Sequence, residues 1–256
     1  MRRSSPSSSP RDPRRSETYP QAPTRRDRRG PDAPRLGAPR VGARERIAVT
    51  PLRAPADRKR LLAEHFADEW GTPRTTERDV FETLSLCGFQ AGLSWETVLL
   101  RRPRLREAFS AFDLDRVAAY DTDDAVRLLA HPGMIRNRRK ISAVIVNARA
   151  SIALRDEGTT LAERIWAYRP ERTVPPASWS DLPRSTPEST ALAAELKRRG
   201  FVFVGPTILF AVMATCGVVD ARPTGSAGQA PADPPHARGP RIQDDASLGR
   251  VTGADR

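Results

Sequence analysis

The residues best suited to chemistry lie in one run, Cys-Gly-Phe-Gln-Ala-Gly-Leu-Ser-Trp, from Cys87 to Trp95. Its two glycines predict a tight backbone turn, because glycine accepts conformations that a Cβ atom excludes. Ser94 is a favourable N-cap, so the indole of Trp95 should open the next helix. A turn that presents Cys87, Gln90 and an aromatic ring suits a pocket for a flat ligand. The alternative is an ordinary connection between two helices with a tryptophan in the core.

A second candidate is the segment 126–141, where an apolar helix end, a Pro-Gly turn and a basic helix start follow one another. This order is typical of a helix-hairpin-helix, in which backbone N–H groups at the hairpin and the helix N-terminus meet DNA phosphate. Basic side chains would supply further phosphate contacts. Those that follow the turn are Arg136, Arg138, Arg139 and Lys140. The alternative is a plain pair of helices with a solvated basic face, and the segment alone favours neither.

The chain lacks the residues that several other kinds of chemistry require. The chain has no Gly-rich phosphate loop with its lysine, no paired-cysteine zinc motif and no His-Glu-x-x-His. Its three histidines are too few and too scattered for a hydrolase triad. Cys87 and Cys216 are the only cysteines, and both lie in apolar surroundings. We therefore expect two buried free thiols in a reducing cytoplasm, with no disulfide framework.

The positive charge is concentrated at one end of the chain. Of the net +12, residues 1–56 carry 14 arginines against 5 acidic residues, so the central segment is close to neutral. These first residues are rich in Pro, Ser and Arg and lack hydrophobic periodicity, which predicts a disordered tail. We expect a second tail over residues 221–256 and a single helical domain over residues 57–220. The opening residues have no apolar stretch, so we expect no secretory signal.

The elements that position both candidates are expected to be helices. Caps and apolar spacing predict helical stretches, with no strand-rich region. These are residues 58–70, 76–86, 95–100, 105–109, 114–119, 122–130, 137–155, 161–168, 188–199 and 206–217. The apolar run 201–219 approaches the length of a membrane span, but Pro206 divides it. The remaining helix of about a dozen residues would be roughly 18 Å long, too short to span a bilayer. The expected fold is all-α.

Longer motifs follow one another along this core. They are Asp68–Gly71, Gln90–Trp95, Gly133–Arg138, Lys140–Ile141, Asn147–Ala150, Lys197–Thr207 and Met213–Gly217. In sequence and order they resemble the DNA-3-methyladenine glycosylase I family, the constitutive alkylation-repair enzymes. The resemblance covers the whole core and leaves out only the two tails. It implies a helix-hairpin-helix glycosylase that flips a damaged nucleotide from double-stranded DNA and hydrolyses the N-glycosidic bond of N3-methyladenine. We also expect a cytoplasmic monomer that needs no cofactor and no membrane.

The resemblance also assigns site residues. Three occupy the family's catalytic positions: Cys87, Gln90 and Trp95. Three more fall in the base pocket: Leu62, His65 and Trp70. The DNA contacts would come from Gly133, Arg136, Arg138 and Lys140. Stacking of the base on Trp95 is expected to contribute about 1–3 kcal/mol.

The chain departs from the family within this pocket. A glutamate that is expected to bond the flipped base is replaced by Cys87, whose thiol is a weak hydrogen-bonding group without a carboxylate's charge. Loss of a bond to a charged group costs about 1.5–3 kcal/mol. Two pocket tyrosines are replaced by Leu62 and His65. Altered or weak excision is one expectation, and a catalytically inactive DNA- or damage-binding relative is the alternative. A helical interaction module without DNA binding is a third.

The family's zinc clasp is the second departure. It uses a cysteine near the start, a histidine before the Glu-Trp-Gly motif and a His-x-x-x-Cys near the end. The matching residues here are Arg53, Phe66, Arg222 and Ser226, which cannot hold zinc as those ligands do. We therefore expect no metal.

Overall fold

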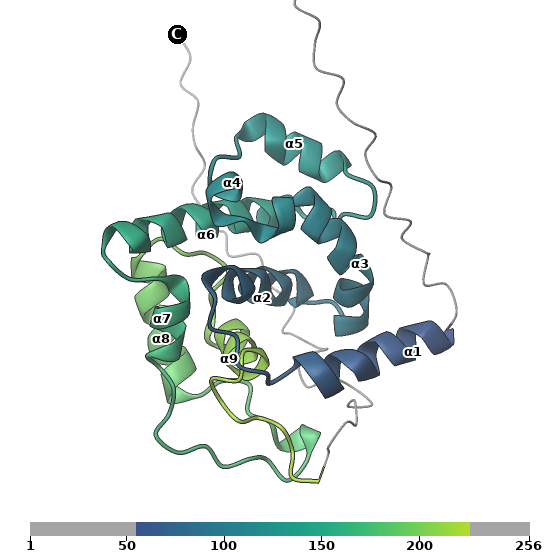
Figure 1. Ribbon diagram of the computed structural model, residues 1–256, viewed down its shortest axis with the longest axis vertical. Helices are drawn as coiled ribbons and strands as arrows, with labels where there is room; N and C mark the ends of the chain where they lie inside the picture. Colours follow the sequence, from purple (N-terminus) through teal and green to yellow (C-terminus); the bar gives the residue numbers. More distant parts are fainter. Residues whose placement is uncertain (1–54, 226–256) are drawn as a thin grey trace, which may run out of the picture. The chain divides into compact units, whose positions relative to one another are not determined.

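The computed structural model describes residues 55–225, which form an all-α fold (Figure 1). The α-helices are α1 (Pro55–Glu64), α2 (Glu77–Gln90), α3 (Trp95–Ala108), α4 (Leu114–Ala118), α5 (Thr122–Ala130), α6 (Arg138–Asp156), α7 (Leu161–Trp166), α8 (Pro187–Arg198) and α9 (Pro206–Thr215). A π-helix, η1 (His65–Glu69), follows α1, and two 3-10 turns are η2 (Ser110–Phe112) and η3 (Trp179–Asp181). No strand occurs within residues 55–225, as the sequence predicted. Residues 1–54 and 226–256 of the two expected tails lie outside the described residues, whereas Ala221, expected to begin the second tail, is buried in the core.

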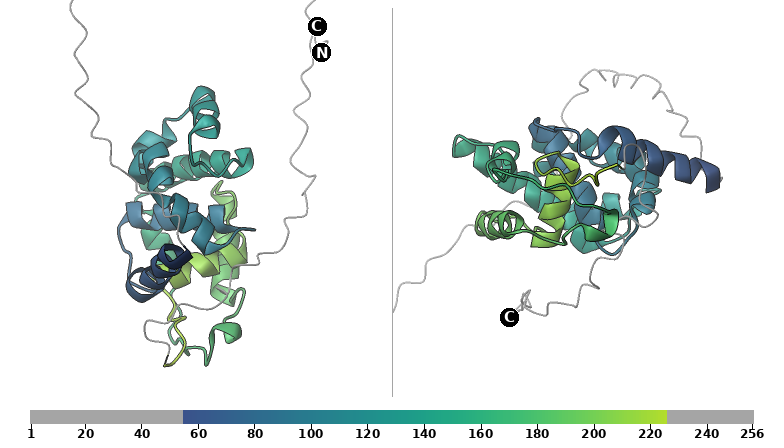
Figure 2. Two further views of the ribbon diagram at one scale, coloured as in Figure 1. Left: turned by 90° about the vertical axis from the view of Figure 1, so that its right-hand side faces the viewer. Right: turned by 90° about the horizontal axis from the view of Figure 1, so that it is seen from below.

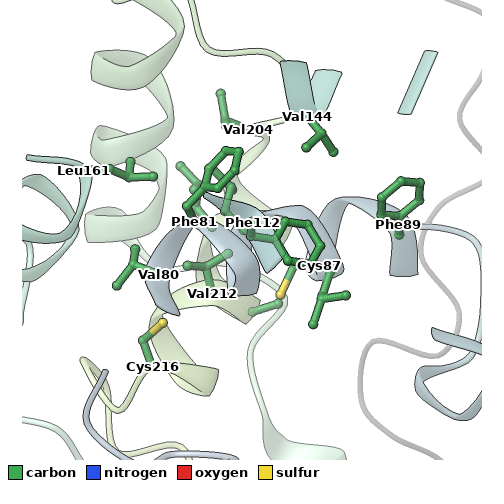
Figure 3. Close-up of a cluster of buried hydrophobic side chains, with 14 of the residues drawn as sticks. Val80, Phe81, Cys87, Phe89, Phe112, Val144, Leu161, Val204, Val212 and Cys216 are labelled. Atoms are coloured by element: carbon green, nitrogen blue, oxygen red, sulfur yellow. The ribbon is translucent and has the colours of Figure 1, made fainter. Parts of the chain in front are cut away.

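Helix α2 is the central element of this part of the chain. It packs against α3, α6, α7 and α9, and almost every residue from Val80 to Gln90 is buried. Figure 3 shows its side chains enclosed by Val144 of α6, Leu161 of α7 and Val212 of α9. A helix that is buried on all sides belongs to the core of a domain. The C-terminal end of α2 is therefore held by packing, and the turn that carries Trp95 starts from this fixed end.

The other helices surround α2 in two groups. Helix α6 packs on α4 and α5, and α8 packs on α9. Helices α4 and α5 lie at one end of the described part, and the link 167–186 lies at the other, in Figure 1 and in the left view of Figure 2. None of the described helices is both long enough and apolar enough to cross a membrane. Helix α9 is a buried core helix, as predicted from Pro206.

The helix starts agree with the capping residues in the sequence. The side chains of Thr76, Ser94, Asp113 and Asn137 each accept a hydrogen bond from a backbone N–H in the first turn of the helix that follows. Such bonds satisfy N–H groups that have no partner within the helix, and each contributes about 1 kcal/mol. Because a cap acts within four residues, it can be recognised from sequence alone.

Two helices continue well beyond their predicted ends. Helix α2 continues through Gly88 to Gln90, so only Gly92, at φ +79°, adopts the left-handed conformation of the turn. Helix α3 continues through Pro103, which was expected to end it. A proline inside a helix removes one hydrogen bond. Burial of Leu99 on one side of it and Leu105 on the other keeps the two halves in one helix.

Candidate functional site

The turn between α2 and α3 fixes the direction of Trp95. The Gln90 side-chain amide donates to the Leu93 carbonyl at 3.1 Å, and the Leu93 N–H donates to the Gln90 carbonyl at 2.7 Å. The Ser94 hydroxyl then accepts from the Thr97 N–H at 3.2 Å. Trp95 is the first residue of α3, and its side chain is only 2% exposed. Gln90 therefore contributes through the shape of the turn, since its amide is engaged within it.

His65 lies directly against Trp95. The two ring centroids are 5.1 Å apart and the planes are tilted by 36°. His65 opens the π-helix η1, and its side chain is 4% exposed. Its Nδ1 lies 2.9 Å from Oε2 of Glu69, whereas Nε2 is buried and has no hydrogen-bond partner among the described residues. The structure thus brings together two of the residues that were predicted to form a pocket.

Glu69 and Arg102 hold this histidine in place. Arg102 of α3 donates to both carboxylate oxygens of Glu69, with Nη2 at 2.8 Å from Oε1. Burial alone would raise the pKa of Glu69, but the bonds to His65 and Arg102 hold it well below its ordinary value. Burial lowers the pKa of His65, although Glu69 opposes this shift. Glu69 is therefore ionised and can only accept, while neutral His65 carries its hydrogen on Nδ1.

Sequence reasoning missed Glu69 and Arg102. The spacing of four residues between His65 and Glu69 was a usable signal, because residues four apart face one another on a helix. Nothing in the sequence indicated that Arg102, 33 residues further on, would complete the arrangement. Arg74 also lies nearby, with Nη2 3.9 Å from Oε2 of Glu69.

Position 87 presents a neutral thiol. Cys87 is 1% exposed and lies on α2, facing the end of α9. Burial, together with the neighbouring Cys216, raises the pKa of this thiol far above its ordinary value, although the hydroxyl of Thr215 opposes the shift. The thiol therefore stays protonated near neutral pH. It cannot act as a general base, and both cysteines are free and buried as predicted.

The remaining pocket candidates have other surroundings. Leu62 is half-buried and packs against the core from α1. Trp70 contacts the rings of Phe66 and Trp179, with centroids 5.8 and 5.3 Å away. Phe66 and Trp179 are themselves 5.5 Å apart. We call these three side chains the aromatic cluster, and Trp70 takes part in it.

The aromatic cluster includes a position where the resemblance implied a zinc ligand. Phe66 has no donor atom, and the Arg222 guanidinium donates to the Trp70 carbonyl. A cation and a phenyl ring do not fit a zinc site, whose ligands are thiolates, imidazoles and carboxylates. The other two positions, Arg53 and Ser226, lie outside the described residues. In this chain ring packing connects η1 to η3, and the Arg222 hydrogen bond connects the end of η1 to the segment after α9.

The basic hairpin is the loop between α5 and α6. Gly133 has φ +83°, and a Cβ atom there would approach Cγ of Arg104 to 3.0 Å, so the loop needs glycine. Arg136 and Arg138 are exposed around the first turn of α6. Asn137 caps this helix through the Lys140 N–H at 3.1 Å. The start of α6 therefore combines a helix N-terminus with exposed positive charge, which suits a phosphate backbone.

Lys140 differs from its basic neighbours. It is 6% exposed, and its Nζ donates to the carbonyl of Phe89 at 2.8 Å and to that of Ala91. Burial lowers its pKa to about 8. It therefore caps the C-terminal end of α2 and lies apart from the exposed arginines. The sequence contained a signal for this burial. Lys140 is four residues from Val144, so it lies on the apolar face of α6.

Known proteins resemble this chain over most of the described residues. A family model for methyladenine glycosylase matches residues 56–228. DNA-3-methyladenine glycosylase 1 of Escherichia coli (strain K12) is 42% identical over 163 residues, which cover 62% of this chain and 87% of that protein. A crystal structure of 3-methyladenine DNA glycosylase I superimposes with a TM-score of 0.62 at 44% identity, covering 64% of this chain and 92% of that chain.

A second solved structure is a tyrosine-to-phenylalanine variant of 3-methyladenine DNA glycosylase I in complex with 3-methyladenine. It has a TM-score of 0.62 at 25% identity and covers 71% of this chain and 95% of that chain. The family model spans more than half of the chain, and the helical fold is the one found in these structures. The chain therefore belongs to the methyladenine glycosylase family.

Proposed function

We propose that this protein is a DNA glycosylase of base-excision repair. In this proposal it binds duplex DNA through the hairpin between α5 and α6 and hydrolyses the N-glycosidic bond of a flipped alkylated purine, with 3-methyladenine as the first substrate to test. The two tasks need two surfaces that are fixed relative to each other. The main observation in support of the proposal is that Lys140 links these two surfaces.

Lys140 lies in the first turn of α6, beside the exposed Arg136 and Arg138. Its ammonium group binds the carbonyls of Phe89, in the last turn of α2, and of Ala91, in the turn that leads to Trp95. A duplex held at the start of α6 would therefore lie in a fixed position relative to the stacking tryptophan. Base flipping needs this kind of arrangement, because the extruded base must reach a pocket at a set distance from the backbone contacts.

The reaction does not require a strong acid or a base at position 87. A purine alkylated at N3 carries positive charge, so it is a good leaving group and needs no strong acid to depart. The protonated Cys87 thiol removes no proton from water. Catalysis would rest on Trp95, which offers a stacking surface, and on a flipped geometry that exposes the sugar to water. The complex of a relative with 3-methyladenine supports this substrate class.

A protein that binds damaged DNA without cutting it is the second candidate. Two observations favour it: position 87 has no charged group, and the rings of His65 and Trp95 are packed against each other. Such a protein would hold the duplex through the same hairpin. It would leave the glycosidic bond intact, because nothing would engage the base edge.

The test is release of free base from methylated duplex DNA by the full chain, measured by chromatography. An unmethylated duplex of the same sequence is the control. Release of 3-methyladenine above the unmethylated control would support the glycosylase. Tight binding of the methylated duplex with no released base would contradict it and favour the damage-binding protein. The Cys87→Glu variant, assayed beside it, reports whether a carboxylate at position 87 raises the rate.

A further inference from the structure

We propose that His65 reads the flipped base, with its Nε2 accepting a hydrogen bond from the exocyclic amino group of an alkylated adenine. This inference rests on the proposed function and adds the residue that would set the preference between purines. It assigns no proton transfer to His65. Its role would be to bind one edge of the base while Trp95 binds the face.

The direction of the hydrogen bond follows from the partners of the other ring nitrogen. Nδ1 of His65 lies 2.9 Å from a carboxylate oxygen of Glu69, and Arg102 donates to both oxygens of that carboxylate. An ionised carboxylate only accepts, so Nδ1 must carry the hydrogen. A neutral imidazole has a single N–H, and Nε2 is left with a lone pair. Glu69 and Arg102 thus make Nε2 an acceptor.

This acceptor has no hydrogen-bond partner among residues 55–225. Nε2 of His65 is buried and forms no hydrogen bond with any described residue. A buried polar atom without a partner costs free energy comparable to a lost hydrogen bond, and such atoms are rare in folded proteins. A ligand that donates at this point would recover that cost. The unpaired atom therefore indicates the chemical type of the group that completes the site.

The position of the ring selects the kind of ligand. His65 contacts Trp95 with ring centroids 5.1 Å apart, so the acceptor lies beside the indole on which a flipped base would stack. Adenine carries an amino group at C6 and donates there, whereas guanine carries an oxo group and accepts. An oxo group facing the Nε2 lone pair would leave two buried acceptors unpaired. A guanine analogue should therefore bind much more weakly than the adenine analogue. Cys87 offers no competing acceptor of comparable strength, because its thiol is a weak one.

The first test reads the hydrogen positions directly. Two-bond ¹H–¹⁵N spectra of the full chain, labelled at histidine, show which ring nitrogen of His65 is protonated. We expect the hydrogen on Nδ1 in the free protein. We also expect a shift of the Nε2 resonance when 3-methyladenine is added as the free base. A hydrogen on Nε2 in the free protein would overturn the proposal, whatever the activity.

The second test uses binding of free 3-methyladenine and free 3-methylguanine, measured by calorimetry. His65→Phe keeps a ring against Trp95 and removes the acceptor. We expect it to weaken 3-methyladenine binding about tenfold to a hundredfold and to erase the preference over 3-methylguanine. His65→Gln retains an acceptor oxygen and should restore part of both. Asp68→Asn changes an exposed residue of the same π-helix and serves as the matched control.

The outcomes separate this inference from the function on which it rests. Unfolding midpoints of all three variants identify any variant that has lost its fold. Base release by the unmodified chain, with equal 3-methyladenine affinity in folded His65→Phe, would overturn the role of His65 and leave the glycosylase intact. No base release by the unmodified chain would overturn the proposed function and this inference with it.

Discussion

Glu69 and Arg102 lie 33 residues apart in the chain and form an ion pair with two hydrogen bonds, one of them 2.8 Å long. The pair joins η1 to α3, the element that begins with Trp95. Because Glu69 also holds His65, one carboxylate sets the distance between the histidine and tryptophan rings. A side chain outside the predicted site thus determines its geometry.

Replacing Arg102 by Met should lower the free energy of unfolding by about 1–3 kcal/mol at pH 7, since Glu69 then keeps a partly buried charge without its main partner. Glu69 has a folded-state pKa below its ordinary value of 4.5. Its contribution is therefore full above about pH 4.5 and is lost as the pH falls below that value. Urea unfolding at pH 7 and pH 3.5 should show a smaller difference between the two proteins at the lower pH. Arg101→Met, at an exposed neighbour, is the control.

Replacing Lys140 by Met should destabilise the fold by about 1–3 kcal/mol, because the Phe89 and Ala91 carbonyls lose their donor. The folded-state pKa of about 8 lies below the ordinary 10.5, so the unfolded chain holds this proton more tightly. Unfolding free energy of the unmodified chain should therefore rise with pH between about 8 and 10.5, relative to the variant. Denaturant titrations across this range test both statements. Arg138→Met, at an exposed position, should leave stability unchanged.

Replacing Arg136 or Arg138 by Ala should weaken duplex binding without regard to DNA sequence, because contacts to phosphate carry no sequence information. Each lost contact should reduce the slope of log K against log salt concentration by about 0.9. Fluorescence anisotropy with a labelled duplex at several salt concentrations measures the slope. Arg184→Ala removes an exposed arginine from the distant link and serves as the control. An unchanged slope in both hairpin variants would show that the hairpin is not the DNA-binding element.

Replacing Trp179 by Ala should lower the unfolding free energy by about 2 kcal/mol, because its ring packs on Phe66 and Trp70 and is only partly exposed. Val174→Ala, at a side chain that is 89% exposed, is the control from the same link.

Addition of a chelator should leave the thermal midpoint of the unmodified chain unchanged. A fall in the midpoint on chelation would show that a metal contributes to the fold.

Much of the helical pattern could be predicted because its signals are local. Ser94 was recognised as a cap, and the structure confirms the helix that it starts. A cap bonds to an N–H two or three residues away, so tertiary contacts hardly alter it. Pro103 and Gly88 were misjudged for the opposite reason. A proline or a glycine inside a helix costs about 1–3 kcal/mol, and burial of the surrounding apolar side chains stabilises the helix by more than that amount.

The sequence by itself determined the all-α class, the family and the position of Trp95 after a capped turn. The tertiary structure alone decided which polar groups meet beside that tryptophan. It placed Arg102 on Glu69 and left His65 Nε2 with no hydrogen-bond partner in the described part of the chain. It also turned Lys140 inward while Arg138 stayed exposed. Burial and electrostatic partners depend on contacts between residues that are distant in the chain, and no local pattern records those contacts.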